Sequence, residues 1–588
     1  MKPLTRLLLA AIAALASLPA LSLNHDVVVA PIGRGPFNVA CSNLEVDAAR
    51  LAFLGGNMAD YFEGRPVNGV QRYATDILAH LDATVHYNAP VPDVRALYVG
   101  NAGGQVPFVA IVCYPTPRAN ADASYTLPDG AVVPHMEQPG TAPKLIRLPE
   151  YLATLGIQAS PAPPDVVAPL PTIIYSHGLG GSPVDKGYLE TIGELAAQGF
   201  IVAAPFHGDP RFSRIRIEDY ADLAYLLLNF DRVVEMQALR PVALKAMLDV
   251  LLASPYAPAI DADRIGGFGA SLGGEAMAHL GGARITATIG GSCGDPVHDP
   301  RIRAFVTYVP YAGQSFLPAF CQGQSGADLV DKPFLAISGT ADTTAPIKMA
   351  EQAVNRMAGS RYLVALTGGK HELRPQDVPD LFTWMITFFD AYLDVRSDPG
   401  AMGRLIRMHG VAGGGDDSLQ VDVHVPFALA NGEALAVEFY NTGLGHYFMA
   451  TGAGEIDNIL KGGAGPGWEL TGQAFKAFPQ PAPGAAPVCR FYGVPAGGPN
   501  SHFFTVDAPE CEQVKRNGGW LYEGIGFHVT PPAADGSCPF GMLQVNRAYN
   551  NGFPRNDSNH RFSISDSTLG EMARLGWTVE GTVMCARP

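Results

Sequence analysis

The sequence has few charged residues and no excess of positive ones. Asp, Glu, Lys and Arg make up 16% of its 588 residues, and the net charge is −15. Proteins that bind nucleic acids carry a basic face that neutralises phosphates, so this composition argues against a nucleic-acid partner. The hydrophobic fraction of 47% is too high for a disordered chain. With 66 glycines and 49 prolines, the chain is typical of a globular protein that has many loops.

Long hydrophobic segments are absent after the first 22 residues. Residues 1–22 combine a charged start at Lys2 and Arg6 with an apolar stretch from Leu7 to Leu18 and small residues before position 22. This pattern is typical of a signal peptide, and the apolar stretch is short for a membrane span. We therefore expect a secreted protein, extracellular or periplasmic, whose mature chain has no transmembrane segment.

The sequence also lacks any C-x-x-C pair. That absence argues against a zinc ribbon or a thioredoxin-type redox site. The eight cysteines are an even number in a chain that we expect to be exported, which favours disulfides. Pairing by proximity in the sequence predicts four bridges: Cys41–Cys113, Cys293–Cys321, Cys489–Cys511 and Cys538–Cys585.

The segment R-I-G-G-F-G-A-S-L-G-G-E, residues 264–275, contains a G-x-S-x-G motif centred on Ser271. A short apolar run precedes the motif and an alanine-rich helical pattern follows it. This strand–turn–helix context is that of a nucleophile elbow, in which the serine lies on a tight turn. Gly269 and Gly273 leave room for the backbone to close the turn. We expect Ser271 to be a catalytic nucleophile.

A serine nucleophile needs a histidine as base and a carboxylate that orients the histidine. In this architecture the chain order is Ser, then Asp or Glu, then His. An expected strand at 333–338 is followed by G-T-A-D, and one at 361–366 is followed by T-G-G-K-H. Both segments leave the carboxyl edge of the sheet, where ligands bind in open α/β sheets. We therefore predict Asp342 as the acid and His371 as the base.

Other ionisable residues near these motifs fit less well. Glu275 lies on the helix of the elbow and points away from the base. Asp331 comes before its strand and so lies at the wrong edge of the sheet. Glu372 neighbours the histidine and fits a solvated side chain better. His207 follows an earlier strand, and a triad built on it would lose the expected chain order.

Catalysis by the serine also needs an oxyanion hole, which backbone N–H groups supply. One donor is expected from Leu272, the residue after the nucleophile. The second is expected from the turn H-G-L-G after the strand at 171–176, with Leu179 as the preferred residue. The side chain of His177 is expected to fix that turn. No metal or organic cofactor is required by this chemistry.

Short apolar runs alternate with helical patterns over 171–392, which predicts βαβ units and a largely parallel sheet. Residues 206–239 interrupt the alternation, and they fit either a cap over the active site or an ordinary pair of surface helices. We expect a catalytic domain over 23–430. The expected elements are strands at 106–117, 171–176, 200–204, 265–268, 285–289, 304–309, 333–338, 361–366 and 419–425, and helical segments at 47–62, 70–81, 188–198, 242–252, 347–357 and 378–392.

From residue 437 onward the sequence repeats. Three units share a Tyr-containing pair, a histidine with Phe two positions later, and G-W-x-x-x-G. Their tryptophans Trp468, Trp520 and Trp577 are 52 and then 57 residues apart. Repeats of this period indicate a symmetric array. We expect an all-β accessory domain at 437–588 that resembles a β-trefoil, with a short propeller-like array as the alternative.

Each repeat places a histidine after a turn: His446, His502 and His560. Metal binding is one interpretation. The other, which we favour, is a histidine ring that forms a hydrogen bond to the backbone at a β-turn. Three-fold symmetry repeats structure more often than it repeats a catalytic centre, so no metal site is predicted.

The motifs S-H-G-L-G-G, F-I-V-A-A-P-F-H-G-D, G-A-S-L-G-G, G-T-A-D and G-K-H together resemble the α/β-hydrolase superfamily. Within it, residues 106–392 are similar to platelet-activating-factor acetylhydrolases and dienelactone-hydrolase-like esterases and lipases. The resemblance implies Leu179 and Leu272 as oxyanion donors. Dienelactone hydrolase itself uses a cysteine nucleophile, whereas this chain has Ser271. The repeats are similar to an accessory module attached to secreted bacterial proteins.

These observations predict a secreted serine esterase or lipase with a lipid-like ester or a polyester as substrate. A polyester fits because a secreted catalytic domain is joined to an aromatic-rich domain that could bind an insoluble surface. Two alternatives stay open: a serine peptidase of the same superfamily, and a protein that binds a glycan or a surface through its C-terminal repeats. The repeats could also be purely structural.

Overall fold

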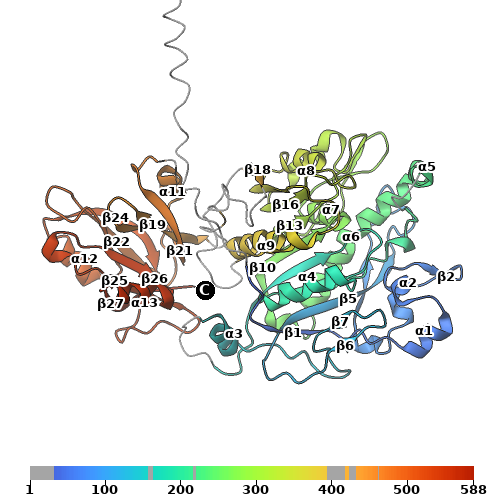
Figure 1. Ribbon diagram of the computed structural model, residues 1–588, viewed down its shortest axis with the longest axis horizontal. Coiled ribbons are helices and arrows are strands. Elements are labelled where there is room, and N and C mark those ends of the chain that lie inside the picture. The colour runs from blue at the N-terminus through green and yellow to red at the C-terminus, as the bar shows by residue number, and fades with distance from the viewer. Residues whose placement is uncertain are drawn as a thin grey trace, which may run out of the picture.

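The computed structural model describes residues 32–156, 163–215, 220–393, 405, 418–422, 432–460 and 462–587 (Figure 1). The expected signal peptide at 1–22 lies outside the described residues. Within the described residues, no helix combines the length and the apolar character that crossing a membrane requires.

The N-terminal part is built on a ten-stranded sheet with the order β1-β5-β9-β8-β10-β13-β16-β17-β18, and β4 pairs with β5. The six strands from β9 to β17 are parallel to one another, whereas β1, β4, β5 and β18 pair antiparallel with their neighbours. The strands are β1 (Asn38–Cys41), β4 (Val85–Pro90), β5 (Gln105–Thr116), β8 (Leu170–Ser176), β9 (Ile201–Pro205), β10 (Ile260–Ala270), β13 (Ile302–Tyr308), β16 (Phe334–Gly339), β17 (Arg361–Leu366) and β18 (Ser418–Asp422).

Helices cover both faces of this sheet (Figure 1). Helices α4 (Lys186–Ala197) and α9 (Val378–Leu393) pack on one face, and α6 (Phe230–Leu251), α7 (Leu272–Leu280) and α8 (Ile347–Val354) pack on the other. Strand β8 shows why: Ile173 and Tyr175 belong to the core beneath α4 and α9, while Ile174 belongs to the core beneath α6 and α7. A parallel strand that is buried on both faces is apolar throughout, because successive side chains point to opposite faces.

The α/β architecture is therefore as predicted, but two segments differ. The expected strand at 285–289 is only a two-residue strand, β11 (Ile285–Thr286), and it pairs with β12 (Cys293–Gly294) outside the main sheet. A turn in which Ala287 N–H bonds Ser292 O ends it. The expected helix at 70–81 is replaced by β3 (Val70–Gln71) and two short 3₁₀ turns, η1 (Ala74–Asp76) and η2 (Leu81–Ala83). Among their apolar residues Ala74 is buried, whereas Val70 is 50% exposed and neither Leu81 nor Ala83 is buried, so the segment lacks the continuous buried face of an amphipathic helix.

The segment 206–239 does not form one unit. It contains α5 (Tyr220–Leu228), but α6 begins at Phe230 and continues without interruption to Leu251. The N-terminal half of α6 packs in the helix layer on the sheet, where Val234 and Ala238 are fully buried. Residues 230–239 are therefore part of the helix layer, and the helix expected at 242–252 is longer than the sequence indicated.

All four predicted disulfides are present: Cys41–Cys113, Cys293–Cys321, Cys489–Cys511 and Cys538–Cys585. The first links paired residues of β1 and β5, which are direct neighbours in the sheet.

The C-terminal part contains three separate three-stranded antiparallel sheets, one for each repeat. Each sheet places its first strand in the middle, and a helix lies between the second and third strands in the chain. The units are β19 (Ala434–Asn441), β20 (His446–Ala450), α11 (Ala453–Leu460) and β21 (Trp468–Ala477); β22 (Ala486–Gly493), β23 (His502–Thr505), α12 (Ala508–Val514) and β24 (Trp520–Val529); and β25 (Leu543–Tyr549), β26 (His560–Ser563), α13 (Asp566–Arg574) and β27 (Thr578–Ala586).

The predicted three repeats are present, but the structure does not show a β-trefoil, and the helices were not predicted. Two of these helices begin at side-chain caps, because Asp507 and Ser565 accept hydrogen bonds from the backbone three residues later. The third strands of the units contact one another in all three pairings. The three units therefore form a closed array.

The repeat histidines lie between these units. His446 forms hydrogen bonds through Nδ1 to Asn500 O (2.9 Å) and through Nε2 to Asp557 Oδ1 (2.8 Å). His502 stacks on Tyr492 of its own unit and packs against Phe448 of the first unit, while His560 stacks on Tyr549 of its own unit and packs against Phe503 of the second. No group of His, Cys, Asp and Glu among the described residues has the arrangement of a metal site.

Candidate active site

Ser271 lies on the turn between β10, which ends at Ala270, and α7, which begins at Leu272. Its backbone has φ 55° and ψ −117°, a conformation that residues with a side chain rarely adopt. Hydrogen bonds on both sides hold it there: Ser271 N–H donates to Tyr308 O, and Tyr311 N–H donates to Ser271 O, each at 2.9 Å. The sheet and the next loop together fix this strained turn.

The two glycines of the motif are required by close backbone contacts. A Cβ atom at Gly269 would lie 2.1 Å from Gly273 O, and one at Gly273 would lie 2.0 Å from Ser176 O. Both distances are far shorter than any van der Waals contact, and the contacted atoms belong to the backbone. The elbow therefore packs directly on the end of β8.

The structure brings Ser271, His371 and Asp342 together. His371 Nε2 lies 3.0 Å from Ser271 Oγ, and His371 Nδ1 lies 2.8 Å from Asp342 Oδ2. Asp342 follows β16 and His371 follows β17, so both reach the site from the carboxyl edge of the sheet. The other oxygen of Asp342, Oδ1, accepts the N–H groups of Thr344 (2.8 Å) and Ala345 (2.9 Å). These bonds fix a buried carboxylate against the histidine.

The structure places the rival residues elsewhere. Glu275 is buried and accepts both hydrogen bonds that Gln237 Nε2 donates, each at 3.0 Å. Asp331 is exposed ahead of β16, and Glu372 is exposed. His207 lies 2.8 Å from Ser176 Oγ, not from the elbow serine.

The two expected oxyanion donors lie beside the serine. A Cβ atom at Gly178 would lie 3.5 Å from Ser271 Cβ, so the turn His177–Gly180 adjoins Ser271. We call this turn the oxyanion turn. Within the described part of the chain, neither Leu179 N–H nor Leu272 N–H has a hydrogen-bond acceptor. Leu272 is the first residue of α7, where helical N–H groups have no acceptor within the helix.

Two buried histidines support the oxyanion turn. His177 Nδ1 lies 2.8 Å from Gly178 O, and His177 Nε2 accepts His207 N–H at 3.2 Å. Because Nε2 accepts, the ring is neutral with its proton on Nδ1. Burial, reinforced by the nearby Arg240 charge, lowers the pKa of His177 to about 4. The side chain of His177 thus has the position expected of a structural residue in this turn.

An apolar wall lies next to the oxyanion turn. Leu272 is buried against Val233 and Met236 of α6. The half-buried side chains that pack on these three are Leu179, Phe212, Ile215, Tyr225, Leu226 and Tyr311. Hydrophobic side chains from the oxyanion turn, α5 and α6 therefore meet at one place beside Ser271.

Sequence reasoning missed two charged residues of the site, Asp209 and Arg240. Both are buried, and they form an ion pair at 2.5 Å directly behind the oxyanion turn. Two signals could have indicated them. Asp209 follows β9 at the same sheet edge as the triad, and Arg240 is a charged residue in an otherwise apolar stretch of α6, where a buried charge needs a partner.

A cavity of about 450 Å³ lies elsewhere in the N-terminal part. It is lined by Leu280 and Gly281 at the end of α7, together with residues 295, 296 and 298–300, which precede β13. Helix α7 begins beside Ser271 and ends at this cavity, so the cavity is separated from the triad by the length of the helix.

Comparisons with known proteins find a family that matches the C-terminal part and solved structures that are similar to this chain. A family described as "Domain of unknown function (DUF5648)" matches residues 435–587, which are the three repeats. A crystal structure of a protein described as a dienelactone hydrolase, from Klebsiella pneumoniae subsp. pneumoniae MGH 78578, is similar with a TM-score of 0.31 and 15% identity. The similarity covers 53% of this chain and 100% of that one. No curated protein matches the sequence.

Proposed function

We propose that this protein is a secreted carboxylic-ester hydrolase of the α/β-hydrolase type, with Ser271 as nucleophile. The observation that carries the proposal is the relay of hydrogen bonds from Ser271 Oγ through His371 to Asp342. Ser271 lies on a nucleophile-elbow turn. Its strained backbone conformation is the one that exposes the serine hydroxyl in such turns. Four disulfides fit an oxidising compartment outside the cytoplasm.

In the proposed reaction His371 Nε2 takes the proton of Ser271 Oγ while that oxygen attacks the ester carbonyl carbon. Asp342 holds the imidazole in the tautomer that carries its proton on Nδ1 and stabilises the imidazolium that forms. Collapse of the tetrahedral intermediate expels the alcohol, which takes the proton from His371. Water then attacks the acyl-enzyme by the same route and releases the acid. Every proton passes through His371, and no cofactor is needed.

The N–H groups of Leu179 and Leu272 are proposed to bind the negative oxygen of the intermediate. Their lack of acceptors among the described residues leaves both donors available for this role. A donor of this kind is typically worth about 3 kcal/mol of transition-state stabilisation, because it is already oriented in a site shielded from water.

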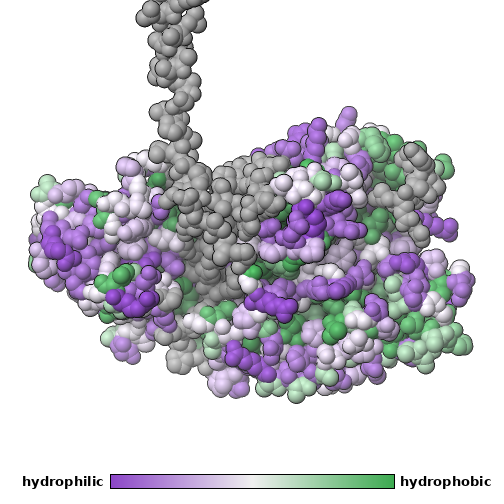
Figure 2. Space-filling model, in the orientation of Figure 1, coloured by the Kyte–Doolittle hydropathy of each residue, from purple (hydrophilic) through white to green (hydrophobic). Residues whose placement is uncertain are grey.

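The apolar wall supports an apolar acyl group as substrate. Leu179 and Leu272 contribute a side chain to the wall and an N–H group to the proposed oxyanion hole, so the acyl chain and the carbonyl oxygen would be bound side by side. Helix α5 adds exposed leucines at its tip, with Leu227 55% and Leu228 83% exposed. Figure 2 shows hydrophobic residues at this edge, at the upper right where α5 lies. A lipid-like ester or a polyester fits this surface.

The test is hydrolysis of p-nitrophenyl esters of increasing acyl length by the wild type and by Ser271→Ala. We expect hydrolysis by the wild type and a loss of about 10³-fold or more in the variant. The matched control is Ser537→Ala, which changes an exposed serine in the C-terminal repeats and should have wild-type activity. A folded wild type that is inert on every chain length, or an active Ser271→Ala, would contradict the proposal. Activity on peptides instead would favour the peptidase alternative.

A further inference from the structure

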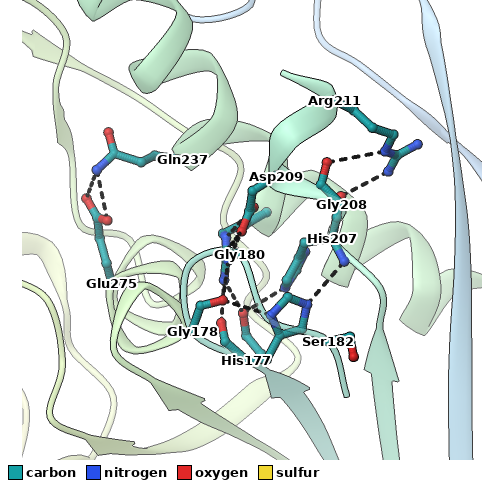
Figure 3. A network of polar contacts seen from close by, with 12 residues as sticks. His177, Gly178, Gly180, Ser182, His207, Gly208, Asp209, Arg211, Gln237 and Glu275 are labelled. Carbon is teal, nitrogen blue, oxygen red and sulfur yellow. Dashed lines mark hydrogen bonds and ion pairs between the residues drawn. The ribbon is translucent and has the colours of Figure 1, made fainter. Parts of the chain in front are cut away.

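Four backbone polar groups of the oxyanion turn form hydrogen bonds to side chains. His177 O accepts Arg240 Nη1 at 2.5 Å, and Gly178 N–H donates to the hydroxyl of Tyr188 at 3.1 Å. Gly178 O accepts Arg240 Nη2 at 2.9 Å, and Gly180 N–H donates to Asp209 Oδ2 at 3.0 Å. Figure 3 shows Asp209 above the turn, with its interactions drawn toward Gly180.

Arg240 and Asp209 form hydrogen bonds to each other as well as to the oxyanion turn. The guanidinium donates through Nε to Asp209 Oδ1 at 3.0 Å and through Nη2 to Oδ2 at 2.5 Å. Burial alone would raise the pKa of Asp209, but the Arg240 charge and hydrogen bonds outweigh it, so the net shift is downward and the carboxylate is ionised. This two-pronged pairing fixes the plane of the guanidinium. Its Nη1 and Nη2 donors are therefore presented to the two carbonyls in a fixed geometry.

Because the peptide bond is planar, these contacts also fix the direction of the Leu179 N–H group. In a trans peptide the C=O of one residue and the N–H of the next lie in one plane and point in opposite directions. Arg240 Nη2 holds Gly178 O, which belongs to the same peptide unit as Leu179 N–H. The Leu179 N–H must then point away from Arg240. Asp209 fixes the next peptide group, between Leu179 and Gly180, through Gly180 N–H. The backbone is therefore held on both sides of Leu179.

A buried ion pair is a costly way to hold a loop. Two charges lose their hydration, and an apolar replacement of similar volume is often at least as stable. Here both side chains are almost fully buried. The donors and acceptors that they do not use for each other form hydrogen bonds to the oxyanion turn and to Ser176 Oγ. The arrangement fits a requirement for accurate backbone placement, which the neighbouring hydrophobic contacts do not supply.

We propose that the Arg240–Asp209 pair positions the Leu179 N–H for oxyanion binding, and so contributes to catalysis without touching the substrate. This proposal rests on the proposed esterase function and adds a residue pair to it. Hydrogen bonding of Gly178 O to a cation also polarises that peptide unit, which makes Leu179 N–H a stronger donor. Loss of the pair should therefore weaken binding of the transition state more than binding of the ester itself.

The test uses the full chain and the variants Asp209→Asn and Arg240→Gln, with kcat and KM measured on the best p-nitrophenyl ester. We expect kcat to fall about 10²-fold, the lower end for loss of one oxyanion donor, and KM to stay within about 3-fold. Inhibition by a boronic acid that forms a tetrahedral adduct with Ser271 should weaken by a similar factor. The acidic limb of the pH–rate profile should keep its midpoint, because the variants do not touch His371. Hydrogen exchange of peptides covering residues 176–183 should become faster.

The matched control is Asp299→Asn. Asp299 is a buried carboxylate paired with Arg301, and it lines the cavity at the opposite end of α7. This variant should lower the melting temperature without changing kcat or the exchange of 176–183. If Asp209→Asn and Arg240→Gln behave like this control, with kcat within about 2-fold of wild type, the positioning role is wrong while the esterase function stands.

The remaining outcomes also decide between the two proposals. If the wild type hydrolyses no ester, the esterase function fails, and exchange at 176–183 still tests whether the pair holds the turn. If both variants lose their folded state, Arg240→Lys replaces them, because an ammonium keeps the charge but lacks the planar fork that reaches both carbonyls. If this variant turns over the ester at least about tenfold more slowly at an unchanged melting temperature, the positioning role is supported. Turnover at the wild-type rate overturns it.

Discussion

At Ser271 the backbone is held in a conformation that a residue with a side chain avoids, and glycines on both sides make this possible. The chain comes so close to itself at Gly273 that a Cβ atom would lie 2.0 Å from the carbonyl oxygen of Ser176. A small substitution at a single position should therefore disturb the whole elbow. The strain is local, but β13 and the loop after it hold the turn by hydrogen bonds, and β8, β10 and α7 meet at it.

Replacing Gly273 by alanine should destabilise the protein by about 3 kcal/mol and abolish ester hydrolysis, because either β8 or α7 must shift to admit the methyl group. Urea unfolding and p-nitrophenyl ester assays measure both effects. The control is Gly193→Ala in α4, where a Cβ atom meets nothing within 4 Å. That change should leave activity intact and raise stability slightly, because glycine disfavours helix. Equal stability of the two variants would contradict the account of the elbow.

His177 provides a prediction for pH. Its pKa is lowered to about 4, so between pH 6.5 and 4 the unfolded chain binds a proton at this position and the folded chain does not. Folding stability from this group is therefore complete above pH 6.5 and declines as the pH falls toward 4. Between pH 7 and pH 5 the wild type should lose about 2 kcal/mol more than His177→Asn in urea unfolding. Identical losses in the two proteins would refute the buried neutral histidine.

Among the elements, the carboxyl ends of the parallel strands bring the residues of the candidate active site together. Ser271, Asp342 and His371 follow β10, β16 and β17, while the oxyanion turn and Asp209 follow β8 and β9. All of these strands point the same way, so five loops converge at one edge of the sheet. The helices between the strands place the loops but contribute few of the polar groups. Arg240 of α6 is the exception, because it reaches the edge from the helix layer.

In the C-terminal repeats, a disulfide links a short helix to its sheet. Cys489 of β22 and Cys511 of α12 form a disulfide that closes a 22-residue separation and ties a seven-residue helix to its sheet. Removing it in the double variant Cys489→Ala/Cys511→Ala should lower the free energy of unfolding of this region by about 3 kcal/mol. Urea unfolding followed by tryptophan fluorescence measures the change. Free thiols at these two positions after non-reducing digestion and mass spectrometry would remove the basis of the prediction.

At the scale of the whole molecule, the closed array of repeats depends on a link between its first and last units. Glu438 of β19 is fully buried and accepts hydrogen bonds from Arg561 of β26, with Oε1 2.9 Å from Nη2. Arg561 also lies over the ring of Tyr447, 4.4 Å from its centroid. Residues 123 positions apart are thus joined in the interior, and the array closes through them.

Glu438→Gln should destabilise the C-terminal part by about 3 kcal/mol or more, because it removes the buried carboxylate that pairs with the guanidinium of Arg561. Differential scanning calorimetry measures the loss. The control is Glu512→Gln, which breaks an exposed pair with Lys515 and should cause no measurable change. A calorimetric trace of Glu438→Gln that matches this control would show that the ion pair does not close the array.

Several features followed from the sequence because they depend on local constraints. The G-x-S-x-G glycines reveal a tight turn, the apolar runs reveal strands buried on two faces, and the carboxylate and histidine after two such runs mark the same sheet edge. The short helices of the repeats escaped prediction, since seven to nine residues carry little periodicity. The strand expected at 285–289 is wrong because residues 285–286 pair with residues 293–294 in a hairpin outside the main sheet.

By itself, the sequence determined the α/β class, the four disulfides, the three repeats and the residues proposed for the triad. Each of these depends on residue type and on order along the chain. Only the tertiary structure decided that Arg240 meets Asp209 behind the oxyanion turn, that Glu438 meets Arg561, and that the repeats form three separate sheets. Such contacts depend on how helices and sheets pack, because a buried polar group is bonded by whichever partner packing brings within reach.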